Sequence, residues 1–248
     1  MTHEHGNGAV DVDFKYITDI THFFPDDPDA QMPDEALALR EYLGHVIKAA
    51  TVTAEVEFLS AIPCRKRVNR KPCPGFVKVM KQEVPESYIY WHCSVCDDGG
   101  RIAKWRDCPY DQSQFAPDAS TDDEVNPRVE VTISRDEMKA LLSDGLYDPE
   151  SDRIIYSARP SGKGIRLHGL YGDMDNFEGY LAADANHEEK RKRQRVMDEL
   201  HEKVHRALQR VYDKHDLGAD LYRPPRAPGD QGAQRGRDGY AEGDQRLV

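Results

Sequence analysis

The sequence has no long hydrophobic run. No stretch approaches the roughly 20 consecutive apolar residues that are needed to cross a lipid bilayer. The first residues, Met1 to Gly6, contain neither a basic start nor an apolar segment. We therefore expect no signal peptide, no membrane attachment and a cytoplasmic location.

The chain also lacks an excess of positive charge and most of the common catalytic motifs. Its 45 acidic residues outnumber its 34 lysines and arginines, which gives a formal net charge of −11. A protein that coats nucleic acid is normally basic, so any such role must depend on a local patch. No Ser, His and Asp set, dinucleotide-binding fingerprint or kinase motif is present. The Pro160–Gly164 segment lacks the full P-loop pattern and is interpreted as a hairpin turn.

Cysteine is scarce, and all five cysteines lie within residues 64–108. Cys93 and Cys96 are three positions apart, a spacing that lets one tight turn direct both sulfurs at a single ion. An earlier pair, Cys64 and Cys73, brackets a basic loop. Two runs with strand character, residues 76–80 and 88–91, lie between the two pairs, and residues 101–105 form a third such run after them. In a reducing cytoplasm, clustered cysteines hold metal more often than they form disulfides.

This order of pair, hairpin and pair resembles the zinc-ribbon superfamily, and the glycines Gly99 and Gly100 after the second pair add to the resemblance. The resemblance covers less than a fifth of the chain, and no family is recognised over its whole length. It departs from the family at the first pair, because eight residues separate Cys64 from Cys73 where two to four are usual.

The resemblance implies one Zn²⁺ ion, and the expected ligands are Cys64, Cys73, Cys93 and Cys96. Cys108 and His92 are alternative ligands, and a set of unligated thiols is the alternative to any metal site. Four thiolates leave no open coordination position, so such a zinc would be structural. A module of this size buries too little apolar surface to fold alone, and zinc binding would supply the missing folding energy.

The loop between the first two cysteines is strongly basic and contains Arg65, Lys66, Arg67, Arg70 and Lys71. Residues 64–108 carry a formal charge of +5, which leaves −16 for the remainder. One interpretation is that these side chains contact the phosphates of a nucleic acid, with Tyr88, Tyr90, Trp91 and Trp105 as stacking surfaces. The other is that they stabilise the negative charge of the thiolates while the aromatic rings fill a small core.

A second motif lies near the C-terminus, where His201-Glu202-Lys203-Val204-His205 matches the His-Glu-x-x-His pattern of zinc metalloproteases. A metal-dependent hydrolase that uses His201, Glu202 and His205 is therefore the alternative function. The charged Lys203 and the absence of a third ligand at a familiar spacing argue against it. We interpret these residues as the polar flank of an amphipathic helix and expect them not to be catalytic.

The predicted fold class is α+β, with small antiparallel β sections, a zinc-ribbon insertion and a C-terminal helical pair that includes one long amphipathic helix. Helices are expected at residues 34–50, 134–142, 173–185 and 189–214, and strands at 52–58, 129–133, 153–158 and 165–170. The expected organisation is a mobile acidic arm (1–30), a helix and strand (31–62), the ribbon (63–108), a linker (109–127), an α+β domain (128–215) and a disordered tail (216–248).

The sequence thus favours a non-enzymatic adaptor or regulator whose zinc ribbon contacts nucleic acid or a protein partner. Its oligomeric state does not follow from these patterns.

Overall fold

The computed structural model describes residues 16–25, 31–84, 86–115, 126–143, 147–162 and 164–215. Most of the predicted acidic arm, linker residues 116–125 and the predicted tail lie outside the described residues. The chain divides into two units, residues 1–211 and 212–248. Every contact given below lies within the first unit.

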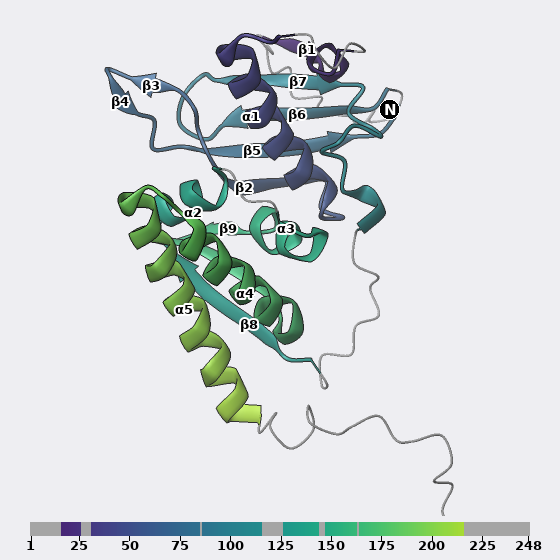
Figure 1. The fold of residues 1–248 in the computed structure, drawn as a ribbon. Coiled ribbons are helices and arrows are strands. Elements are labelled where there is room, and N and C mark those ends of the chain that lie inside the picture. Colours follow the sequence, from purple (N-terminus) through teal and green to yellow (C-terminus); the bar gives the residue numbers. More distant parts are fainter. Residues whose placement is uncertain are drawn as a thin grey trace, which may run out of the picture. The chain divides into compact units, whose positions relative to one another are not determined.

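The described residues form a mixed α+β structure (Figure 1). Its α-helices are α1 (Asp34–Thr51), α2 (Arg135–Leu141), α3 (Pro149–Tyr156), α4 (Tyr171–His187) and α5 (Arg191–His215). Its strands are β1 (Ile17–Asp19), β2 (Glu57–Pro63), β3 (Arg67–Val68), β4 (Lys71–Pro72), β5 (Phe76–Gln82), β6 (Tyr88–Cys93), β7 (Gly99–Ala103), β8 (Arg128–Ile133), β9 (Arg159–Ser161) and β10 (Gly164–Leu170). Two short 3-10 helices are η1 (Ile20–Phe23) and η2 (Ser113–Phe115).

The larger sheet has five strands in the order β1, β7, β6, β5, β2. β1 runs parallel to β7, and the other neighbours are antiparallel. Helix α1 crosses one face of this sheet (Figure 1), where alternate side chains such as Val77, Val79, Ile89 and Trp91 are buried. The positions between them are half-buried, as expected for an antiparallel sheet with one covered face.

The second sheet has three antiparallel strands in the order β8, β10, β9. Val129, Val131 and Ile133 of β8 alternate as buried residues with exposed neighbours. Their side chains belong to the same hydrophobic core as those of the five-stranded sheet. The first unit is therefore built around one continuous core that both sheets share.

Several local predictions are confirmed. Ser134 and Glu137 form the predicted capping box of α2, since Ser134 Oγ accepts from Glu137 N–H (3.2 Å) and Glu137 Oε2 accepts from Ser134 N–H (2.6 Å). In α5, the apolar stripe that includes Leu200, Val204 and Leu208 is buried.

None of the helices in the described residues combines the length and apolar character needed to cross a membrane.

The strand predicted at residues 153–158 is wrong, because residues up to Tyr156 belong to helix α3. The run Ile154-Ile155-Tyr156 has strand propensity, but helix-start signals precede it. Asp148 Oδ1 accepts a hydrogen bond from Ser151 N–H (2.7 Å), and Pro149 occupies the first turn, where its missing N–H has no cost. The cap outweighs the propensity of three residues.

The strand predicted at residues 52–58 is displaced toward the C-terminus. Helix α1 continues to Thr51, a turn follows, and β2 begins only at Glu57. Val56 of the alternating pattern is 62% exposed. Alternation of apolar residues over so short a span does not distinguish a strand from a turn that buries only its first residue, Val52.

Helices α1 and α3 meet through two partly buried polar contacts. His45 Nδ1 lies 2.8 Å from Tyr156 Oη, and Lys48 Nζ lies 2.6 Å from Asp152 Oδ2. Burial lowers the pKa of His45 from its usual 6.5 to about 4, and nearby Lys48 acts in the same direction. The histidine is therefore neutral in the folded protein at neutral pH.

This burial predicts a pH-dependent stability term. As the pH falls below 6.5, the unfolded chain protonates His45 while the folded protein does not, so the free energy of unfolding decreases. Between about pH 7 and pH 5.5 the expected loss is about 1 kcal/mol. Urea unfolding of His45→Gln should show a shallower pH dependence than wild type over this window. Equal slopes for the two proteins would contradict the prediction.

Candidate metal centre

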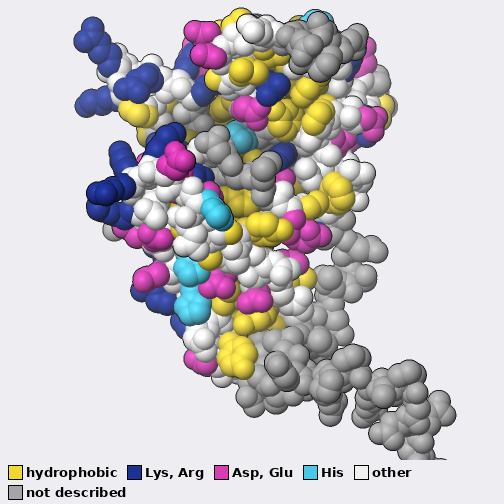
Figure 2. Space-filling model, in the orientation of Figure 1, with side chains coloured by type: hydrophobic (Ala, Val, Ile, Leu, Met, Phe, Trp, Pro, Cys, Tyr) yellow, Lys and Arg dark blue, Asp and Glu magenta, His cyan; other side chains and the backbone are white. Residues whose placement is uncertain are grey.

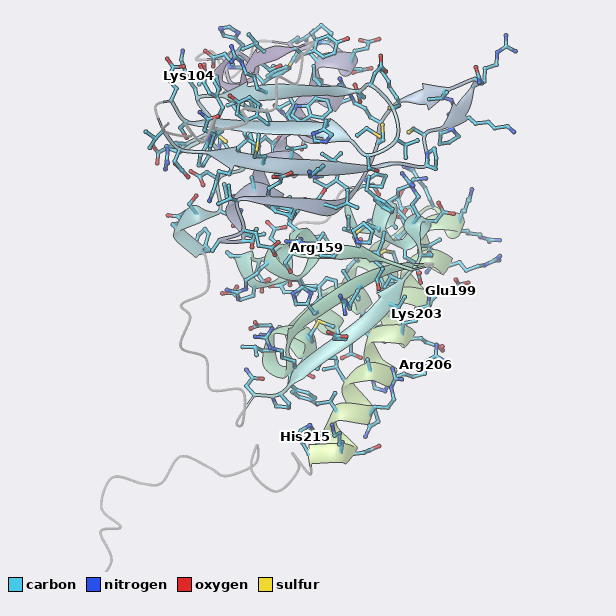
Figure 3. The ribbon with its side chains drawn as sticks, turned by 180° about the vertical axis from the view of Figure 1, so that it is seen from behind. Lys104, Arg159, Glu199, Lys203, Arg206 and His215 are labelled. Carbon is cyan, nitrogen blue, oxygen red and sulfur yellow. The ribbon has the colours of Figure 1, made fainter. Side chains whose placement is uncertain are left out.

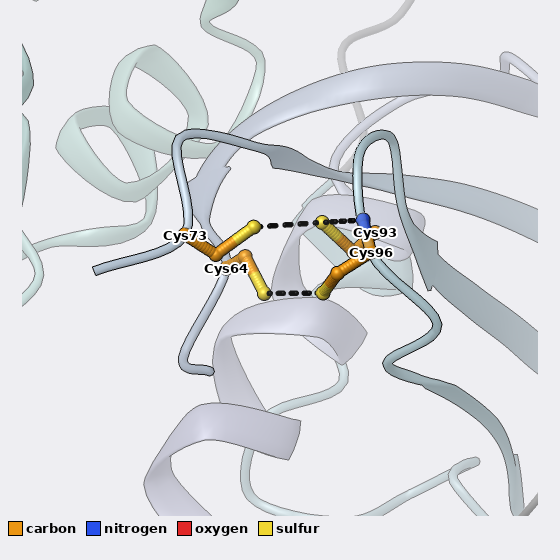
Figure 4. A group of neighbouring side chains, drawn as sticks. All are labelled: Cys64, Cys73, Cys93 and Cys96. Atoms are coloured by element: carbon orange, nitrogen blue, oxygen red, sulfur yellow. Dashed lines mark hydrogen bonds between the residues drawn. The ribbon is translucent and has the colours of Figure 1, made fainter. Parts of the chain in front are cut away.

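The four predicted ligands come from segments at one end of the five-stranded sheet. Cys64 follows β2, Cys73 follows β4, Cys93 ends β6, and Cys96 lies in the turn before β7. All four sulfur atoms lie within 4.8 Å of one another (Figure 4). The fold thus brings together side chains that are up to 32 positions apart in the sequence.

The sulfur separations fit a tetrahedral metal site. Cys64 Sγ lies 3.6 Å from Cys96 Sγ, and Cys73 Sγ lies 3.6 Å from Cys93 Sγ, while all five cysteines are free thiols. In a tetrahedral four-thiolate site with metal–sulfur bonds of about 2.3 Å, neighbouring sulfurs are about 3.8 Å apart. The cluster can therefore hold one ion with little rearrangement.

A bulge in β2 helps to place Cys64. The register with β5 shifts between Leu59 and Pro63. The buried Ser60 stabilises the bulge, since its hydroxyl donates to Val77 C=O (2.7 Å) and accepts from Ile62 N–H (3.3 Å). Strand bulges redirect the chain next to functional sites. This one precedes the first cysteine by a few residues.

Backbone N–H groups point at the sulfurs. Cys64 Sγ accepts from Lys66 N–H (3.4 Å) and Cys73 Sγ accepts from Gly75 N–H (3.4 Å), so both cysteines of the first pair have a donor two positions later. Cys93 Sγ accepts two such bonds, from Val95 and Cys96. Hydrogen bonds of this kind stabilise thiolates and are typical around metal-bound sulfur.

The pKa shifts of the cysteine thiols show how far their surroundings favour or oppose the deprotonation that metal binding requires. Burial raises the pKa values of Cys64 and Cys96, whereas the Gly75 N–H lowers the pKa of Cys73. Burial without a counter-charge therefore opposes full deprotonation of the cluster. A metal ion supplies that charge, so metal binding and proton release are coupled here.

The basic loop divides into two groups with different surroundings. Arg65 Nε lies 3.3 Å from Asp98 Oδ2, and its guanidinium stacks over the rings of Tyr42 and Trp91. Asp98 is buried and lies 3.9 Å from Cys64 Sγ. Lys66 pairs with Asp97 at 2.9 Å. These two basic residues belong to the surroundings of the cysteine cluster.

The remaining basic residues lie on the hairpin of β3 and β4, which projects from the five-stranded sheet (Figure 1). Asn69 and Arg70 at its tip both have positive φ, which suits the tight turn of a two-residue hairpin. Arg67 donates two hydrogen bonds to Arg70 C=O and closes the turn. Arg67, Arg70 and Lys71 are all exposed.

Two residues that are not among the predicted site residues hold the first cysteine pair. Arg135 at the start of α2 donates to the carbonyls of Cys73 (3.1 Å), Pro74 and Gly75 (2.5 Å), and its guanidinium stacks over Phe76. Gly75 is buried, and a Cβ there would collide with Cys93 Sγ. The Cys-Pro-Gly sequence gives a signal for Gly75. No local signal points to Arg135, which is 60 positions away.

The alternative ligands lie outside the cluster. Cys108 packs against the main hydrophobic core, and His92 lies opposite Lys78 in the sheet.

The two tryptophans proposed as stacking surfaces, Trp91 and Trp105, are core residues that are only 1–2% exposed. That part of the nucleic-acid hypothesis is therefore wrong. Tyr88 and Tyr90 are half-buried.

The His-Glu-x-x-His residues lie on α5. His201 Nε2 and His205 Nδ1 both contact Glu178 Oε1 of α4, at 3.1 and 2.9 Å. Glu202 is exposed and lies 3.8 Å from Arg206. Within the described residues, Cys64, Cys73, Cys93 and Cys96 form the only group of three or more metal-ligating side chains whose arrangement could hold an ion.

Comparison with known proteins leaves the site to be interpreted from its own geometry. No protein-family model matches the chain, and no curated protein or solved structure matches it significantly.

We predict one bound metal ion per chain. Cys93→Ser removes a sulfur that contacts Cys73 and should abolish metal retention and unfold at least residues 64–108, since structural zinc sites contribute about 10–16 kcal/mol. Cys108→Ser should retain the metal and cost about 1 kcal/mol. Elemental analysis together with thermal melts tests both variants. Equal metal content in the wild type and Cys93→Ser would contradict this assignment.

Gly75→Ala should weaken metal retention although no ligand is changed, because the added methyl group collides with Cys93 Sγ. Gly179→Ala is the matched control. Gly179 lies in α4, and nothing lies within 4 Å of a Cβ at that position. Competition with a chromophoric chelator should show about tenfold or greater loss of affinity for the first variant only, the range seen when groups that orient metal ligands are altered. Equal retention in both would contradict the role of Gly75.

Proposed function

We propose that this protein is a zinc-stabilised, non-enzymatic adaptor in which residues 64–108 form a zinc ribbon that contacts the phosphates of a nucleic acid. The cysteine cluster supports zinc because four sulfur ligands at tetrahedral spacing are typical of structural zinc sites. A closed four-thiolate site supports a structural role for the ion, and no step of catalysis is assigned to it.

The observation that carries this proposal is the basic hairpin of β3 and β4. Arg67, Arg70 and Lys71 are exposed on an arm whose base is fixed by Cys64 and Cys73. The structure describes no acidic partner for Arg70 or Lys71 among the residues it covers. Arginine and lysine held in this way are suited to phosphate contact, which orients a protein on nucleic acid without reading its bases.

The start of α5 extends this basic surface. Arg191, Lys192 and Arg195 are exposed in its first turns. Contacts through α2 connect them to the hairpin, because Arg135 binds the Cys73–Gly75 carbonyls and Arg193 Nη2 donates to Ala140 C=O (3.3 Å). Figure 2 shows lysine and arginine side chains gathered at the edge that carries β3, β4 and the start of α5. We call the hairpin and these turns the basic edge.

The burial of both tryptophans also bears on the kind of contact. Single-strand binders stack bases on exposed aromatic rings, and the basic edge has no exposed tryptophan among its described residues. Phosphate contacts are therefore the main source of affinity in this proposal. The acidic remainder of the chain would repel a polyanion, which restricts docking to this edge.

Salt titration tests the proposal. Wild-type protein should bind a short duplex at low salt, with log affinity falling linearly with log salt at about 0.9 per contacted phosphate. Lys71→Gln should reduce that slope by about one contact without changing zinc retention. Lys104→Gln is the matched control, because Lys104 is 68% exposed and lies at the opposite end of the five-stranded sheet (Figure 3).

Arg65→Gln separates the two roles of the basic loop. It should weaken zinc retention in a chelator assay, since Arg65 neutralises Asp98 beside Cys64. A wild-type protein that binds neither RNA nor DNA at low salt would refute the nucleic-acid role. Binding that Lys71→Gln and Lys104→Gln reduce equally would refute the basic edge as its site.

A further inference from the structure

A pocket of about 520 Å³ lies where the two sheets meet. The turn after α1 forms one wall, α3 and β9 form another, and the ends of β8 and β10 complete it. Arg159, which lines it, lies between the two sheets (Figure 3). The volume is within the range of small-molecule sites, about 300–1,000 Å³.

Three arginines line this pocket, namely Arg128, Arg153 and Arg159. The carboxylates that line it are Glu55 and Asp173. Arg153 lies 3.5 Å from Asp173, and Arg159 lies 2.9 Å from Glu55. The side chains of Arg153 and Arg159 are 24% and 20% exposed, which holds their charges in a medium where solvent screening is reduced.

Arg159 is fixed before any ligand arrives. Its Nη1 donates to the carbonyls of Ser157 (2.6 Å) and Ala158 (3.1 Å), and its guanidinium lies 4.0 Å from the centroid of the Phe58 ring. A planar guanidinium held in this way presents its remaining N–H groups in a fixed direction. Preorganised arginine donors of this kind match the oxygens of phosphate groups.

His168 reports the positive potential of the same pocket. Burial lowers its pKa, and Arg159 and Arg128 lower it further, while Glu130 acts in the opposite direction. Arg166 adds to the lowering from the same strand. The ring is therefore neutral near pH 7 and can donate one hydrogen bond to an anion.

The floor of the pocket is apolar. Val52 and Ile154 line it and are 5% and 2% exposed, and Leu170 is half-buried beside them. Gly169 permits this packing, because a Cβ there would lie 3.1 Å from both Ile154 Cγ1 and Met174 Cγ. A cationic rim above an apolar floor is complementary to a molecule with an anionic group on an organic body.

We propose that this pocket binds a small organic phosphate, with Arg153 and Arg159 holding the phosphate and Val52, Ile154 and Leu170 contacting the organic body. This site is separate from the zinc centre and the basic edge, and its function is ligand binding without assigned chemistry. The guanidinium donors recognise the phosphate itself, so inorganic pyrophosphate must bind as well, and an organic phosphate such as AMP must bind more tightly.

Isothermal titration with pyrophosphate and AMP tests the site on the full, metal-loaded chain. Arg153→Gln should weaken binding of both about tenfold or more, the usual effect of losing a charge-assisted hydrogen bond. Arg70→Gln is the control, because it removes an exposed arginine of the basic edge and should leave both affinities unchanged. Loss of binding in Arg70→Gln instead would assign the phosphate to the basic edge and overturn the proposal.

Two further measurements test the same site and do not depend on the stability of Arg153→Gln. The His168 ring resonance should titrate at higher pH with pyrophosphate bound, because the anion offsets the nearby arginines. Leu170→Ala should weaken AMP binding while leaving pyrophosphate binding unchanged. Wild-type protein that binds no pyrophosphate at about 10 mM, or a His168 titration that pyrophosphate does not move, would overturn the proposal.

Discussion

The convergence of four sulfurs, three of them on buried cysteines, is the constraint on which one end of the structure depends. Burial opposes negative charge on Cys64 and Cys96, while backbone N–H groups favour it on Cys73. A bound metal ion would resolve this conflict and would join the end of β2, the base of the β3 and β4 hairpin and the turn between β6 and β7. A hairpin with so little buried surface needs such an anchor, because every residue of its two strands is exposed.

Arg135 connects this end to the rest of the first unit. Its guanidinium satisfies three carbonyls around Cys73, while the helix that carries it packs into the common core through Met138 and Leu141. Glu137 in the same helix is bound by Lys203 of α5 at 2.7 Å. The cysteine cluster, α2 and α5 are thus linked by charged contacts at the edge of a shared core. A disturbance at the cluster is therefore expected to reach beyond residues 64–108.

Arginine side chains have three different roles in this molecule, and the groups around each guanidinium determine its role. Arg65 offsets a buried carboxylate beside a sulfur, Arg70 lies exposed at the tip of a hairpin, and Arg159 is fixed by carbonyls and an aromatic ring in a pocket. The distribution of charge over the whole chain also affects how a basic side chain can act. A local positive surface on an acidic chain restricts where an anionic partner can approach.

The sequence by itself determined the features that depend on neighbouring residues. The Cys93 and Cys96 spacing, the capping box of Ser134 and Glu137 and the apolar stripe of α5 are local patterns, and the α+β class followed from them. Tertiary structure decided the rest. The wide spacing of Cys64 and Cys73 is accommodated because the intervening residues form their own hairpin, and the Asp148 cap made residues 153–156 helical against their strand propensity. The roles of Gly75 and Arg135 and the arginine pocket arise from contacts between distant segments. Such contacts leave no periodic signal in the sequence, because their energy comes from burial and pairing that exist only in the folded chain.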